Sequence, residues 1–123
     1  MITEDDEFYE LCYAGLLVSD CTVSPETRII FKAKTSGWIL SMNAEFLLRR
    51  AISSSESAAL ASLVGIELSR LRVSKKDGRL KAEFSNGSVL IVMPDPDYEA
   101  WQLTSDTGTR LLAVPGDGLA FWS

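Results

Sequence analysis

The sequence predicts an α+β protein that is mostly β, with a curved antiparallel sheet, barrel-like or sandwich-like, and two short helices at one end. Many short β-rich segments follow one another, and most are separated by turns rather than helices, an order that favours antiparallel pairing. Asn86-Gly87 stands between two such segments and is a strong hairpin signal, because a type I′ turn needs positive φ at both central residues. The length of 123 residues is that of one domain, and we expect a single domain over 1–123 without a linker.

The first helix is expected over residues 3–13. Thr3 is a suitable N-cap, acidic side chains fill the first turn, and Phe8, Leu11 and Cys12 recur on one helical face. The second helix is expected over 53–65, where serines precede a run of alanines and leucines and Gly65 ends it. Strands are expected in the first half over 15–24, 28–34, 38–42 and 45–50, although the composition of the last segment would also suit a helix.

The order of elements repeats after a shift of about fifty residues, which predicts two similar meanders. The first covers 1–52 with its N-terminal helix, and the second covers 66–123 with a C-terminal hairpin. The matched positions are Gly15 with Gly65, Ser19 with Ser69, Val23-Ser24 with Val73-Ser74, Gly37 with Gly87, and Leu40 with Leu90. The alternative is that β patterning alone produces this likeness.

Composition excludes several classes of function. The chain has no histidine, so histidine-based acid–base catalysis, catalytic triads with histidine and most zinc sites are not expected. Cys12 and Cys21 lack the spacing of a redox motif and follow no secretion signal, so we expect two reduced thiols and a cytoplasmic protein. No run of about 18 apolar residues predicts a membrane span. We therefore expect no catalytic residue, no cofactor and no metal.

Charge is unevenly distributed along the chain. The formal net charge is −5, which argues against a nucleic-acid partner, because binding to phosphates needs a basic surface. Residues 28–81 nevertheless carry eleven basic and four acidic side chains. We interpret these basic residues as outward-facing positions on strands, beside acidic neighbours, although a local basic face is the alternative. The acidic balance of the whole chain predicts a partner with a basic surface.

The candidate partner-binding residues lie in two connections of the second half. Residues 94–98 have no counterpart in the first half, and loops on a rigid sheet commonly carry binding. Their prolines limit the entropy lost on binding, and a tyrosine beside acids is typical of an interface anchor. A purely structural turn is the alternative, because Asp-Pro-Asp is a common turn composition. The candidates are Asp95, Asp97, Tyr98, Glu99 and, in the next turn, Asp106.

Three motifs in the second half resemble a family of small bacterial proteins of unknown function. They are Phe84-Ser85-Asn86-Gly87, Tyr98-Glu99-Ala100-Trp101-Gln102-Leu103 and Pro115-Gly116-Asp117 before a final apolar strand. The third departs from the family pattern, which often has a second glycine after Pro-Gly. Family members resemble the acidic immunity proteins encoded beside bacterial polymorphic toxins. The resemblance implies an immunity protein that neutralises a cognate toxin domain; an inhibitory or adaptor protein of another bacterial or phage system, and a small-molecule binding domain, are the alternatives.

Overall fold

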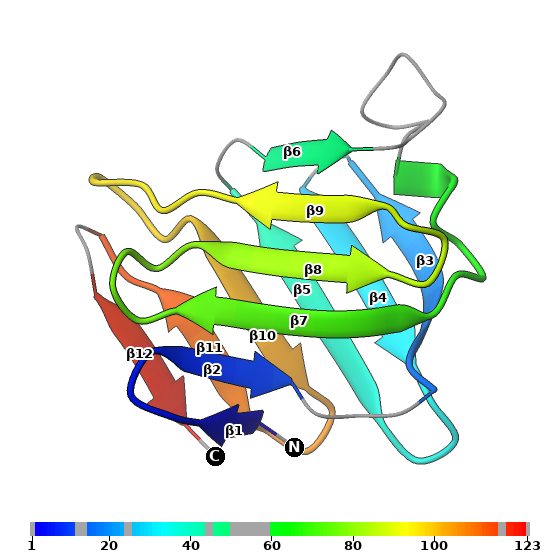
Figure 1. Cartoon of the computed structure of the whole chain (residues 1–123), viewed down its shortest axis with the longest axis horizontal. Coiled ribbons are helices and arrows are strands. Elements are labelled where there is room, and N and C mark those ends of the chain that lie inside the picture. Colours follow the sequence, from blue (N-terminus) through cyan, green and yellow to red (C-terminus); the bar gives the residue numbers. More distant parts are fainter. Residues whose placement is uncertain are drawn as a thin grey trace.

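A computed structural model describes residues 2–11, 15–23, 26–43, 46–49, 60–115 and 118–122. These residues form two open antiparallel sheets of six strands each, whose strands cross one another (Figure 1). Sheet 1 contains, in spatial order, β1 (Ile2–Glu4), β2 (Phe8–Leu11), β7 (Leu68–Ser74), β8 (Leu80–Phe84), β9 (Val89–Val92) and β6 (Phe46–Arg49). Sheet 2 contains β12 (Leu119–Trp122), β11 (Arg110–Ala113), β10 (Trp101–Ser105), β5 (Gly37–Met42), β4 (Thr27–Lys32) and β3 (Leu17–Thr22).

The expectation of an α+β fold with one curved sheet and two helices is wrong. The described chain is nearly all β, and the N-terminal segment forms the hairpin of β1 and β2 instead of a helix. Asp5 turns this hairpin, because its Oδ1 accepts hydrogen bonds from the backbone N–H groups of Glu7 and Phe8, each at 2.8 Å. The expected helix also extended to Cys12 and Tyr13, which lie outside the described residues.

The second expected helix is also absent from the described residues. Residues 50–59 lie outside them, and in the segment that follows only Leu60 and Ala61 are helical before the turns of 62–65. Leu63 donates to the carbonyl of Leu60 at 3.0 Å, and Val64 donates to that of Ala61 at 3.2 Å. Leu60 and Leu63 are fully buried, so this short segment supplies two side chains to the core without continuing as a helix. No helix in the described ranges is long and apolar enough to cross a membrane.

The two halves of the chain build similar meanders in different sheets. Strands β3, β4 and β5 pair in sequence order in sheet 2, and β7, β8 and β9 do so in sheet 1. The first pair of each meander has a register shift at the same place, next to Ser19 in one half and next to Ser69 in the other. The fourth strands are exchanged, because β6 pairs with β9 of the other half and β10 pairs with β5 (Figure 1).

The core lies between the two sheets and is made by alternate strand residues. In β5, for example, Trp38, Leu40 and Met42 are buried and the residues between them are partly exposed. Trp101 is fully buried at the start of β10, where its indole Nε1 donates to the carbonyl of Gly78 at 3.0 Å. This bond ties the β7–β8 turn to the strand after the 94–98 insertion, and it therefore positions the loops described next.

Candidate functional site

Three connections lie side by side at one end of the molecule (Figure 1). They are residues 5–7 between β1 and β2, residues 75–79 between β7 and β8, and residues 93–100 between β9 and β10. The middle turn joins the other two, because Lys75 N donates to Glu7 O at 2.9 Å and Gly78 O accepts the indole hydrogen bond of Trp101. These three connections are called the loop end.

The base of the 93–100 loop is firmly held. Asn43 N donates to the carbonyl of Ala100 at 2.7 Å, and its side-chain Nδ2 donates to the carbonyl of Glu99 at 3.3 Å. Ala100 and Trp101 have no exposed surface. Within the loop, Asp97 N donates to Asp95 Oδ1 at 2.8 Å, an Asx turn that shapes the tip. Asn43 therefore fixes the C-terminal end of the 93–100 loop.

The tip of this loop presents both apolar and charged side chains. Tyr98 is 51% exposed and Met93 is 46% exposed, values that are high for large apolar groups in a folded domain. Asp97 and Glu99 are also exposed, on either side of Tyr98. Together they form a surface with the composition of a protein-binding patch, an aromatic anchor among charges.

Acidic side chains outnumber basic ones at the loop end. The basic side chains are those of Lys75, Lys76 and Arg79, and Lys75 Nζ is hydrogen-bonded to Glu4, which raises the lysine pKa. The acidic side chains are those of Asp5, Asp6, Glu7, Asp77, Asp95, Asp97 and Glu99. The pKa of Asp5 is lowered, first by the hydrogen bond from the backbone of Glu7 and then by that from Phe8. The end thus carries net negative charge at neutral pH.

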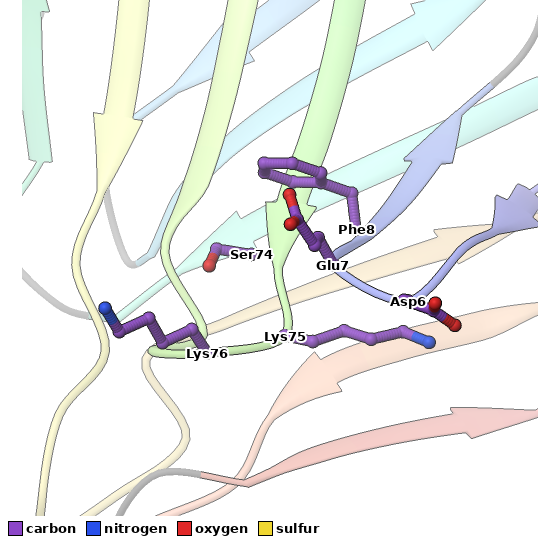
Figure 2. A pocket seen from close by; sticks show the side chains of 6 residues that line it. All are labelled: Asp6, Glu7, Phe8, Ser74, Lys75 and Lys76. Carbon is purple, nitrogen blue, oxygen red and sulfur yellow. The ribbon is translucent and has the colours of Figure 1, made fainter.

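A hollow of about 480 Å³ lies between the first two connections. It is lined by Asp6, Glu7, Phe8, Ser74, Lys75 and Lys76. Figure 2 shows the Lys75 side chain extending toward Asp6, whereas Lys76 extends the other way, and the Phe8 ring lies beside the Glu7 carboxylate. The hollow is open and charged, so it suits a polar side chain of a partner better than an apolar small molecule.

Four of the five predicted partner-binding residues lie together, and the fifth does not. Asp95, Asp97, Tyr98 and Glu99 share the loop between β9 and β10. Asp106 follows the opposite end of β10, where its backbone N donates to the carbonyl of Gly37 at 3.0 Å. The length of β10 therefore separates Asp106 from the loop end.

A second charged surface covers the outer face of sheet 1. Arg70 and Arg72 on β7, Lys81 on β8 and Arg79 just before β8 line a groove of about 260 Å³ together with Phe8, Ser74 and Glu83. In the strand register Arg72 lies opposite Lys81, and Arg70 lies opposite Glu83. We call this the cationic groove. The spacing of two residues between Arg70 and Arg72 along β7 is the sequence signal for this shared face, because side chains two apart on a strand point the same way.

Glu10 organises one side of the cationic groove. Its Oε1 accepts hydrogen bonds from Nε of Arg72 at 2.8 Å and from Nε of Arg70 at 3.2 Å. Partial burial favours the neutral form of Glu10, but the two arginines outweigh that effect and lower its pKa. The carboxylate is therefore ionised at neutral pH and fixes both guanidinium groups.

The described cysteine is poorly suited to nucleophilic chemistry. Cys21 is half-buried, and burial, followed by the charge of Asp20, raises the pKa of its thiol to about 11. Cys12 lies outside the described residues, so the expected state of that thiol is untested. Within the described ranges, no group of three or more histidine, cysteine or acidic residues is placed to hold a metal ion.

One protein-family model matches most of this chain. The model of a family of unknown function, DUF6188, matches residues 14–123. The chain belongs to this family. The match includes β3 to β12 and so both meanders and the 93–100 loop, whereas β1 and β2 with the Asp5 turn precede it. Comparisons with curated proteins and with solved structures gave no match.

Proposed function

We propose that this protein is an immunity protein that binds a bacterial toxin domain through its loop end and thereby neutralises it. One observation carries the proposal: the 93–100 loop presents exposed Tyr98 between Asp97 and Glu99 on a base held by Asn43 and the buried Trp101. A rigid loop of this composition loses little entropy on binding. The proposed function requires only that the chain binds the toxin domain, and it requires no catalysis.

The charge of the loop end supports a partner with a basic surface. Toxin domains that act on nucleic acids carry basic clefts, and an acidic surface accelerates encounter with such a cleft. The acidic groups of 5–7 and 93–100 flank the β7–β8 turn, so their fields add over one end of the molecule. Exposed charges of this kind change the association rate more than the dissociation rate, and salt screens them.

The test uses a toxin domain encoded beside the gene for this chain. We expect co-expression of the chain to protect a bacterial host from that domain. Asp97→Lys should slow association and weaken its salt dependence, and Asp95→Lys with Asp97→Lys should do so more strongly. Asp106→Lys is the matched control, because it makes the same change of charge at an exposed aspartate beyond the far end of β10.

Two results would contradict the proposal. One is a host that stays unprotected although the chain is folded and expressed. The other is an equal decrease of the association rate in Asp97→Lys and Asp106→Lys. That result would show that the rate depends on the net charge of the chain and not on the loop end. Melting temperatures and circular dichroism of Asp97→Lys and Asp106→Lys should match those of the parent protein, because both aspartates are exposed in loops, whereas Asp95→Lys also removes the acceptor of the Asx turn.

A further inference from the structure

We propose that the cationic groove of sheet 1 binds a compact anion with a diphosphate-like charge, such as inorganic pyrophosphate. The groove lies on β7, β8, the adjacent Phe8 of β2 and Arg79 of the β7–β8 connection, and it contains no residue of the 93–100 loop that carries the proposed function. The inference is therefore independent of the proposed function, and either can fail without the other.

The first argument is the arrangement of like charges. Arg72 and Lys81 are direct cross-strand neighbours, a pairing that destabilises an antiparallel sheet. Arg79 lies in the same groove, directly after the last ladder pair of Val73 with Leu80, and Ser74 N donates to Arg79 O at 2.9 Å. Among the described residues, no ion pair of the Arg79 side chain is found. An anion held between these three groups would remove their mutual repulsion.

The second argument is that two of the four cations, those of Arg70 and Arg72, are held in place before a ligand arrives. Glu10 binds Arg70 and Arg72 through their Nε atoms, which uses one of the five N–H donors of each guanidinium. The Arg72 guanidinium also lies over the Phe8 ring, with Cζ 4.3 Å from the ring centroid. The guanidinium planes are thus oriented while other donors remain for an oxyanion, and pre-organised arginines are well suited to phosphate oxygens.

The third argument concerns size and charge. The groove brings together four cations and the carboxylates of Glu10 and Glu83, so it holds an excess of positive charge that a dianion or trianion would neutralise. Its volume of about 260 Å³ suits two phosphate groups. A long polyanion is disfavoured, because the acidic loop end adjoins the groove at Phe8 and Ser74, which also line the hollow of Figure 2. The whole chain at −5 would also repel it.

Titration calorimetry with inorganic pyrophosphate tests the site. We expect saturable binding to one site, weakened as sodium chloride is raised from about 0.05 to about 0.2 M. Arg72→Gln and Arg79→Gln should each raise the dissociation constant roughly tenfold or more, the effect of losing a charge-assisted hydrogen bond. Arg28→Gln is the control, because Arg28 is an exposed, ion-paired arginine on sheet 2, and it should leave the constant within about twofold.

Further measurements make the result decisive. Arg79→Gln leaves the Glu10 contacts intact, so it tests the site even if Arg72→Gln disturbs the fold. Acetate at the same concentration should not displace pyrophosphate. The proposal is overturned if pyrophosphate shows no saturable binding at millimolar concentrations, or if Arg28→Gln weakens it as much as Arg79→Gln. It is also overturned if a short single-stranded oligonucleotide binds the groove more tightly than pyrophosphate, since that would assign the groove to nucleic acid.

Discussion

Phe31 and Phe84 stack between the two sheets, with ring centroids 6.5 Å apart and ring planes at 17°. They hold equivalent places in the two halves of the chain. Phe31 pairs with Val18 just before the register shift of β3, and Phe84 pairs with Leu68 just before the register shift of β7. The centre of the core is therefore a contact between corresponding residues of the two meanders.

The backbone repeats this relationship at the corner where the meanders meet. Val18 N donates to Ile66 O at 3.0 Å, and Leu68 N donates to Leu16 O at 2.8 Å. Val18 corresponds to Leu68, and Leu16 corresponds to Ile66, so each half donates one of these bonds and accepts the other. This is the arrangement expected of two halves related by a two-fold axis. Together with the exchanged strands β6 and β10, this makes each half depend on the other for a complete sheet.

Truncation of the stacked pair should be strongly destabilising. Phe31→Ala and Phe84→Ala should each lower the free energy of unfolding by about 3–5 kcal/mol, because both rings are buried in the centre of the core. The decrease in the free energy of unfolding of the double variant should be smaller than the sum of the two single decreases by about 0.5–1.5 kcal/mol, because the ring contact can be lost only once. Urea unfolding of the four proteins measures this coupling. Strict additivity would show that the stack contributes no energy of its own.

Gly78 should be intolerant of a side chain although space for one exists. Its φ is +74°, and an added Cβ would lie 3.6 Å from Pro94 and 3.7 Å from Leu119, which are ordinary contacts. Gly78→Ala should therefore cost about 1–2 kcal/mol through backbone strain alone. Gly37→Ala is the control, because Gly37 has no positive φ and its Cβ would lie 3.5 Å from Asp106. Thermal unfolding that ranks Gly37→Ala as the worse variant would contradict this.

The Glu10 contacts should make stability depend on pH in the acid range. A carboxyl whose pKa is lowered by folding stabilises the folded state above its unfolded pKa, here 4.5, and loses that contribution as pH falls through the folded pKa. Glu10→Gln should lower the free energy of unfolding by about 0.5–1 kcal/mol at pH 7, a modest value because the arginines are partly exposed. Urea unfolding at pH 7 and again near pH 3 should show the difference shrinking. A constant difference would assign the effect to packing.

The Cys21 thiol should react slowly in the folded protein. In a Cys12→Ala background, a disulfide reagent at about pH 8 should modify folded Cys21 roughly a hundredfold more slowly than the urea-unfolded chain, because folding raises the thiol pKa from 9.0 to about 11. The raised pKa also means that stability falls as pH rises from 9.0 toward 11, since the unfolded thiol ionises first. Equal rates in the two states would contradict the burial of this thiol.

Local patterns correctly located many of the strands and turns. The Asn86-Gly87 turn does join paired strands, as its glycine and the flanking β-rich segments predict, and the strands expected over 28–34 and 38–42 correspond to the paired β4 and β5. The helix predicted for the N-terminal segment is wrong because the spacing of three between Phe8 and Leu11 fits a helical face, whereas in the strand these two residues lie on opposite faces. Its alternation of partly exposed Phe8 and Glu10 with inward Tyr9 and Leu11 is a strand pattern, and β7 supplies both the ladder and the arginines that Glu10 binds.

The sequence by itself thus predicts the alternation of buried residues that fills the core. It also shows the acidic insertion at 94–98 and the lack of histidine side chains. It does not reveal that β6 leaves its own meander for β9, that β10 joins β5, or that Asp106 stands apart from Asp95. Periodicity reports only which side of a strand is buried, whereas the choice of partner strand depends on contacts between residues far apart in the chain. The cationic groove arises in the same way. Arg70, Arg72, Arg79 and Lys81 gather because β7 and β8 pair in one register, and Glu10 reaches them from a strand some sixty residues earlier.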